Sequence, residues 1–88
     1  MNQNIWGPHF WVTLHTLTFN YPLEPTTKDK NNHYTFFTIL KDILPCSICR
    51  KNFSRKLKED PLKQHLNSRR DMVEWMVDCH NKVNAETG

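Results

Sequence analysis

The sequence predicts an all-α protein, a four-helix bundle with short connections. Apolar residues recur at helical spacing in four stretches, and no stretch shows the alternation of a half-buried strand. Prolines interrupt the chain between most of these stretches, where a helix cannot continue. Hydrophobic residues make up 38% and charged residues 24% of the 88 residues, so we expect one soluble domain over 1–88 with a small core.

The first helix is expected from Trp6 to about Asn20 and ends at the proline-rich segment 21–25. Its broad apolar stripe consists of Trp6, Phe10, Trp11, Leu14, Leu17 and Phe19. Thr26 or Thr27 is expected to cap the second helix. That helix should end before a proline and bury Tyr34, Phe37, Leu40, Ile43 and Leu44.

The third helix is expected from about Cys46 to Lys58, ahead of an Asp-Pro break. At positions i, i+4 and i+8 one of its faces carries Cys49, Phe53 and Leu57. Ser68 followed by Asp71 resembles a capping box for the last helix. The apolar residues of that helix are Met72, Val73, Trp75, Met76, Val77 and Val83.

Cys46 and Cys49 stand three residues apart at the start of the third helix. Such a pair can close into a reducible disulfide, and a helix start favours the reactive thiolate. A thioredoxin-like site would need a βαβ unit, which this chain does not predict. Zinc needs four ligands, which Cys79 and His80 could complete. These two residues are adjacent, however, and point about 100° apart on a helix, so a single metal ion could hardly bind both. No metal site is therefore expected, although a cofactor-free or zinc-stabilised helical interaction module remains the alternative function.

The formal net charge is +3, with 12 Lys and Arg against 9 Asp and Glu. Many of the cations lie between Arg50 and Lys63, where they alternate with apolar residues and no aromatic-basic stacking platform for a nucleic acid accompanies them. We interpret this run as a solvated helix face and expect no nucleic-acid partner. No apolar run approaches the roughly 20 residues of a membrane span, and the N-terminus lacks the pattern of a signal peptide.

Aromatic and polar side chains share faces of the first and last helices. Trp11 and His15 are four residues apart, as are His80 and Asn84, with Asn81 between the latter two. Polar groups inside a bundle must be hydrogen-bonded, and a large planar, polar cofactor would supply partners for them. The sequence therefore favours a cofactor site between these two helices.

Together these motifs resemble the Erv/ALR family of FAD-dependent sulfhydryl oxidases. The similarity runs in order over nearly the whole chain, through Trp6-Gly7, Trp11-x-x-Leu14-His15-Thr16, Tyr21-Pro22, Pro45-Cys46-x-x-Cys49, Arg69, Trp75 and His80-Asn81-x-Val83-Asn84. The cysteine pair alone would be weak evidence, but the combination is specific.

The resemblance implies a four-helix bundle with a short additional helical turn, cradling FAD and usually assembled as a homodimer. It implies that Cys46 exchanges with thiol-containing protein substrates or a dithiol shuttle protein, and that Cys49 lies next to the flavin. Electrons would pass through FAD to O2 and give hydrogen peroxide. The implied cofactor contacts are Gly7, Trp11, His15, Cys49, His80, Asn81, Val83 and Asn84.

Three departures from cellular members are visible. Pro8 replaces an arginine after the early glycine, and no cysteine near Val77 supplies a second disulfide, which leaves Cys79 as a lone thiol. The chain also lacks a shuttle cysteine pair, which could lie on a segment outside this sequence or on a partner. The first two departures resemble the compact forms of large DNA viruses. A viral protein would act in the host cytoplasm or the virion, and a cellular one in the mitochondrial intermembrane space or secretory pathway.

Overall fold

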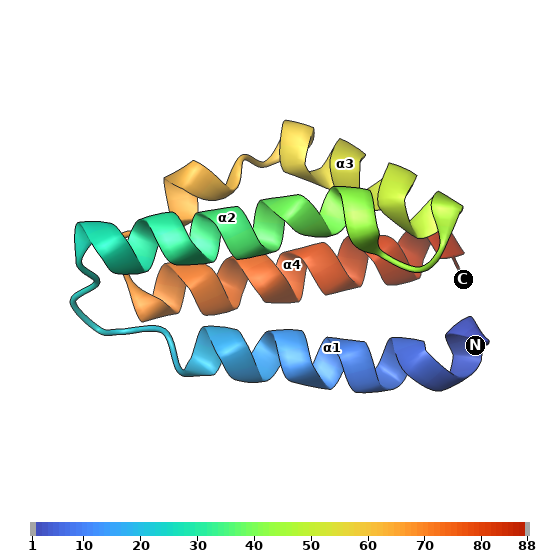
Figure 1. The fold of residues 1–88 in the computed structure, drawn as a ribbon, viewed down its shortest axis with the longest axis horizontal. Helices are drawn as coiled ribbons and strands as arrows, with labels where there is room; N and C mark the ends of the chain where they lie inside the picture. The colour runs from blue at the N-terminus through green and yellow to red at the C-terminus, as the bar shows by residue number, and fades with distance from the viewer. Residues whose placement is uncertain (1, 88) are drawn as a thin grey trace.

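The computed structural model describes residues 2–87, and for 84–87 only the helical backbone. The elements are α1 (Gln3–Phe19), α2 (Thr27–Ile43), α3 (Ser47–Glu59), the 3-10 helix η1 (Leu62–His65) and α4 (Arg69–Thr87). No strand occurs within 2–87 (Figure 1). The predicted all-α bundle is confirmed, and η1 is the short additional helical turn.

The helix boundaries follow from local hydrogen bonds. Thr26, the first of the two candidates, caps α2 in a reciprocal capping box with Asp29. At the start of α4 the Ser68 hydroxyl accepts a hydrogen bond of 3.1 Å from the Asp71 N–H. The first helix begins earlier than predicted, because Asn2 provides a cap ahead of Gln3.

The packing of the helices brings three chain segments to one end of the bundle. α4 packs along α1, and α2 packs against α3. Both termini lie at the end where α2 passes into α3 (Figure 1). The first turns of α1, the start of α3 and the last turns of α4 therefore meet there, and they carry most of the predicted site residues.

Trp75 of α4 is the centre of the core and is fully buried. Its ring meets Phe37 edge-on at 6.0 Å and Phe53 at 6.4 Å, between ring centroids. The other buried apolar residues are Leu14, Tyr21, Leu40, Leu62, Leu66, Met72, Met76 and Cys79.

The second helix carries two apolar stripes, and only one of them faces the core. Phe37 and Leu40 are buried as predicted, while Tyr34 and Leu44 are half-buried. The expectation that Ile43 is buried is wrong, because 61% of it is exposed. It belongs to a second, exposed stripe at i, i+3 and i+7 that consists of Phe36, Ile39 and Ile43.

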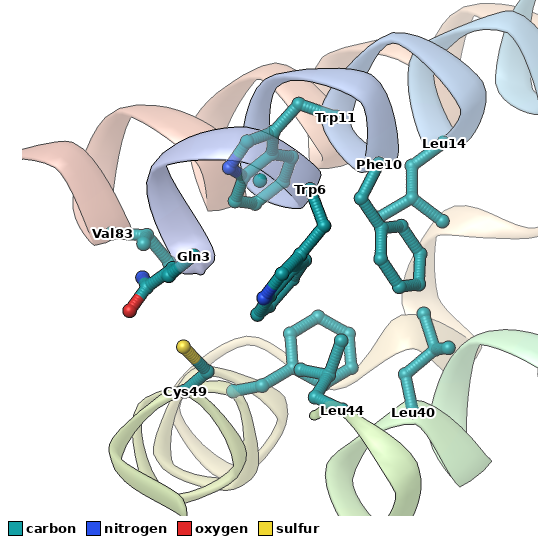
Figure 2. Close-up of a pocket in the computed structure, with 11 residues that line it drawn as sticks. Gln3, Trp6, Phe10, Trp11, Leu14, Leu40, Leu44, Cys49 and Val83 are labelled. Carbon is teal, nitrogen blue, oxygen red and sulfur yellow. The ribbon is translucent and has the colours of Figure 1, made fainter. Parts of the chain in front are cut away.

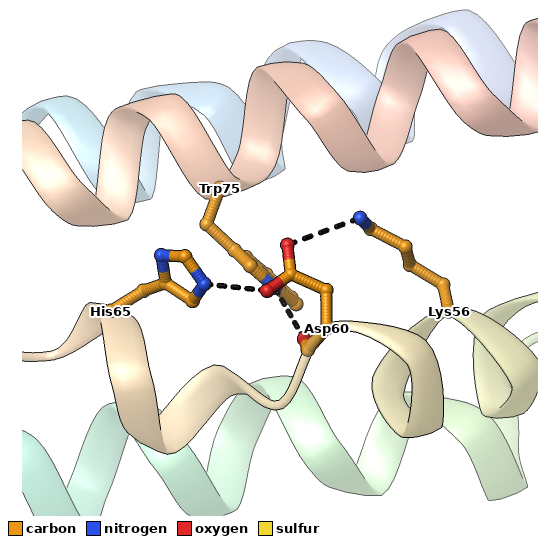
Figure 3. A network of polar contacts seen from close by, with 4 residues as sticks. All are labelled: Lys56, Asp60, His65 and Trp75. Carbon is orange, nitrogen blue, oxygen red and sulfur yellow. Dashed lines mark hydrogen bonds and ion pairs between the residues drawn. The ribbon is translucent and has the colours of Figure 1, made fainter.

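A polar network fastens the junction between α3, η1 and α4 (Figure 3). The Asp60 carboxylate accepts from Lys56 Nζ at 3.3 Å and contacts His65 Nε2 at 2.7 Å. The Trp75 indole N–H donates to the Asp60 carbonyl at 3.1 Å. Lys56 is only 4% exposed, so the carboxylate is the counter-charge that a buried ammonium requires.

Two residues of the resemblance, Tyr21 and Arg69, meet across the fold. The Arg69 Nε donates to the Tyr21 carbonyl at 2.5 Å, and the Tyr21 hydroxyl donates to the Leu66 carbonyl at 2.6 Å. These bonds tie the α1–α2 connection to the start of α4, 48 residues away along the chain.

Candidate functional site

The cysteine pair lies at the first turn of α3. Cys46 is the N-cap residue, and its Sγ accepts a hydrogen bond of 3.3 Å from the Cys49 N–H. The two Sγ atoms are at disulfide-bonding distance, with the Cα atoms 5.1 Å apart. Both side chains are half-buried. The two cysteines therefore form a disulfide, at the positive end of the helix dipole.

The turn before α3 is held by contacts to two other elements. Arg50 Nη1 donates to the Leu44 carbonyl at 2.5 Å, which closes the turn between α2 and α3. Gln3 Oε1 of α1 lies 3.6 Å from Cys46 Sγ. In the disulfide this sulfur has no proton, so the approach is a contact; in the reduced thiol it becomes a weak S–H···O hydrogen bond.

A small apolar cavity of about 70 Å³ lies behind the disulfide, between α1 and the α2–α3 pair. Figure 2 shows the Cys49 sulfur directed from α3 toward α1, on the side of this cavity. Cys46 does not line it. The residues that do are Gln3, Trp6, Gly7, Phe10, Trp11, Leu14, Leu40, Leu44, Cys49, Phe53 and Val83.

Several of these lining residues were not predicted as site residues. Trp6, Phe10 and Leu14 belong to the predicted apolar stripe of the first helix, at i, i+4 and i+8, and were not named as cofactor contacts. The same periodicity points them at the cavity, so spacing alone did not separate packing from ligand contact. Nothing in the sequence marked Gln3 as a site residue, because it precedes the predicted start of the first helix.

An open groove of about 630 Å³ adjoins the cavity and runs along α1 and α4. The groove and the cavity share Gly7, Trp11 and Val83, along with Gln3. Its further lining residues are Asn4, Pro8, Val12, His15, Thr16, Phe19 and His80. An apolar pocket next to the disulfide thus continues into a partly polar groove.

His80 of α4 lies flat on Trp11 of α1, with ring centroids 4.0 Å apart and planes inclined by 11°. His15 Nε2 is 3.0 Å from His80 Nδ1. One of these two nitrogens must donate and the other accept, so the two rings cannot both be charged in this arrangement. Burial, reinforced by the charge of His15, lowers the pKa of His80 from its usual value.

Gly7 leaves the junction of the cavity and the groove open. A Cβ placed on this residue would meet only Gln3 Cγ, at 3.9 Å, so a side chain here would project into otherwise empty space. The site therefore has room for a flat ligand close to the backbone of α1.

The remaining predicted positions differ in where they lie. Asn81 is exposed and lines neither the cavity nor the groove. The side chain of Asn84 lies outside the described residues. Within the described part of the chain, no group of three or more His, Cys, Asp or Glu side chains is arranged to hold a metal ion.

Cys79 is free and buried in the core, which confirms the prediction that it is a lone thiol. Burial is the main reason that its pKa rises to about 12. The thiol is thus protonated at neutral pH and takes no part in the redox pair. Among the helices the structure describes, none has the length and apolar character needed to cross a bilayer.

Comparison with known proteins agrees with this geometry. The sequence profile of the Erv1 / Alr family matches residues 8–88. A probable FAD-linked sulfhydryl oxidase of Acanthamoeba polyphaga mimivirus, R368, is 40% identical over 89 residues, which cover 100% of this chain and 62% of the relative. The mitochondrial FAD-linked sulfhydryl oxidase ERV1 of Saccharomyces cerevisiae is 35% identical, over 91% of this chain and 41% of the yeast protein. The chain thus spans less than two thirds of the length of either relative.

Solved structures are similar to this chain in fold as well as in sequence. The crystal structure of the yeast Erv1 core superposes with a TM-score of 0.92 at 31% identity, over 99% of this chain and 72% of that chain. The crystal structure of the FAD-binding domain of Erv1 from Saccharomyces cerevisiae gives the same TM-score of 0.92 at 32% identity.

Proposed function

Because this chain belongs to the Erv1/Alr family, we propose that residues 1–88 form an FAD-dependent sulfhydryl oxidase domain. The domain oxidises protein dithiols to disulfides through Cys46 and Cys49 and delivers the electrons to O2. The observation that carries this proposal is the position of Cys49, which belongs to the disulfide and also lines the apolar cavity.

The residues present fit a flavin dinucleotide. The cavity next to Cys49 is lined by apolar and aromatic side chains, which suits a flat ring system, and the adjoining groove is partly polar. The open space above Gly7 gives such a ligand close access to α1. Trp11, His15, His80 and Val83 would hold FAD along the groove, and we retain Asn81 and Asn84 as further contacts on the resemblance alone.

Thiol exchange begins at Cys46, which does not face the cavity. A substrate thiolate attacks Cys46 Sγ, the disulfide breaks, and Cys49 leaves as a thiolate within the first turn of α3. The helix dipole stabilises that negative charge. The second substrate thiolate then attacks the substrate sulfur, which releases a substrate disulfide and leaves two electrons on the Cys46–Cys49 pair. Bound FAD would supply the acceptor for these two electrons, so that the Cys46–Cys49 disulfide re-forms, with O2 as the final acceptor and hydrogen peroxide as the product.

The resemblance also implies a homodimer, and the second stripe of α2 supports this part of the proposal. Phe36, Ile39 and Ile43 are 42%, 47% and 61% exposed on one helix face. Contiguous exposed apolar side chains commonly mark a protein interface. We expect Ile39→Asp to shift the purified protein from dimer to monomer in sedimentation analysis, whereas a wild-type monomer would contradict the dimer.

The test of the oxidase proposal is the visible spectrum of the purified protein. The protein should be yellow, lose its flavin absorbance when dithiothreitol is added without air, and recover it when air is admitted, with hydrogen peroxide formed. A colourless protein that takes up no added FAD would overturn the proposal. Stoichiometric zinc in that colourless protein would instead support the interaction-module alternative.

A further inference from the structure

The basic run that the sequence carries after Arg50 lies on the exposed face of α3. Lys51, Arg55 and Lys58, which we call the basic stripe, are all exposed and stand at i, i+4 and i+7 on one face of this helix. Ile48, between the two cysteines, lies on the same face and is 58% exposed. The stripe therefore begins beside the redox disulfide and leads away from it.

The charges of this stripe are incompletely compensated. Arg55 Nε has an ion pair with Glu59 at 3.7 Å, but no ion pair joins Lys51 or Lys58 to another described residue. Outside the stripe, Lys41, Lys56 and Arg70 have carboxylate partners, whereas Lys30 bonds the Asn67 side chain and Lys63 lies over the Tyr34 ring. Lys51 and Lys58 therefore carry positive charge that no carboxylate of the described residues neutralises.

The surroundings of the disulfide add to this charge. The first turn of α1 contains no acidic residue, and the only described carboxylate in the last turn of α2 is Asp42, which pairs with Lys41 at 3.1 Å. Arg50 lies next to Cys49 and donates to a carbonyl rather than to a carboxylate. A polypeptide that approaches Cys46 therefore meets a positive surface that starts at the exposed apolar side chain of Ile48.

We propose that Ile48 and the basic stripe form the docking surface for the substrate polypeptide and select cysteines flanked by Asp or Glu residues. This inference rests on the proposed oxidase function and specifies its substrate class. Opposite charges accelerate encounter, and like charges discriminate against the wrong partner.

The dimensions of the helix set the expected position of the acidic residues. At 1.5 Å per residue, Lys51 and Lys58 lie about 6 Å and about 16 Å along the axis from the start of α3. An extended peptide covers about 3.3 Å per residue. Acidic side chains about two to five residues from the attacking cysteine would therefore lie over the stripe.

The test compares two dithiol peptides of equal length and identical cysteine core, one flanked by Glu and the other by Lys. The FAD-loaded protein oxidises each, and O2 consumption gives kcat/KM at low and at high salt. We expect the acidic peptide to be preferred about tenfold at low salt, with the preference collapsing at high salt. Lys51→Glu should abolish the preference and leave the oxidation of uncharged dithiothreitol unchanged.

Lys28→Glu is the matched control, because Lys28 is exposed at the far end of α2 and its reversal changes the net charge equally. Equal rates for the two peptides, or equal effects of the two variants, would overturn the docking surface. A cysteine-free DNA oligonucleotide that inhibits as strongly as a cysteine-free acidic peptide would also overturn it, in favour of a nucleic-acid surface. If the FAD-loaded wild-type protein does not oxidise dithiothreitol, the result would instead count against the oxidase function itself.

Discussion

The imidazoles of His15 and His80 come together from helices at opposite ends of the sequence, with His15 Nε2 3.0 Å from His80 Nδ1. The indole of Trp11 is stacked on the His80 ring. The family resemblance implied both histidines as cofactor contacts. In the fold the two rings share one hydrogen bond, in which one ring nitrogen donates and the other accepts.

The His80 ring should therefore titrate below its usual pKa of 6.5, first because of burial and second because of the charge of His15. The unfolded chain binds this proton more readily, so stability should fall as the pH drops through about 6.5. NMR titration of the imidazole protons measures the midpoint directly. His15→Gln should raise the His80 midpoint, and a wild-type midpoint above the usual value would refute the assignment.

Replacement of the cavity-lining cysteine should separate cofactor binding from turnover. We expect Cys49→Ser to keep the yellow colour, because the groove is intact, but to lose O2 consumption with a dithiol. Oxygen electrode traces and the flavin spectrum of the same sample provide the two readouts. Cys79→Ala serves as the control and should turn over normally; normal turnover of Cys49→Ser would remove Cys49 from its proposed role.

The Asp60 carboxylate should make stability depend on acidic pH. Burial raises its pKa, but the hydrogen bonds from His65 and Lys56 outweigh that effect, and the net pKa is lowered. The stabilisation is thus present above the unfolded-state pKa of about 4 and is lost as the pH falls through the folded value. Urea unfolding of wild type and Asp60→Asn between acidic and neutral pH measures this dependence.

At neutral pH, Asp60→Asn should cost about 3 kcal/mol, because it leaves the Lys56 ammonium buried without a counter-charge. That value is at the low end for buried pairs, since the Asp60 side chain is 24% exposed. Asp42→Asn is the matched control, because its ion pair with Lys41 is exposed, and it should change stability by less than about 1 kcal/mol. Equal effects of the two substitutions would show that the network does not stabilise the junction.

The buried thiol of Cys79 should be inert in the folded protein. Its pKa of about 12 keeps it protonated, and its core position denies access to alkylating reagents. Mass spectrometry after treatment with a maleimide should find no adduct on the native oxidised protein and one adduct on the unfolded protein. Labelling of the native protein at the unfolded rate would contradict the buried position.

The sequence by itself determined the helices and the redox pair, because both depend on near neighbours. Caps such as Thr26 and Ser68 satisfy backbone groups within three residues, and Cys46 and Cys49 are one helical turn apart. Periodicity correctly placed Phe37 in the core.

Only the tertiary structure decided which side of each helix meets which neighbour. Ile43 and Leu44 are adjacent in sequence, yet one lies on an exposed stripe and the other lines the cavity, since packing directions depend on distant helices. The same reason separates Cys49, which faces the cavity, from Cys46, and brings Gln3 to the disulfide. The pairing of His15 with His80 likewise required α1 and α4 to pack side by side, a contact between residues 65 positions apart.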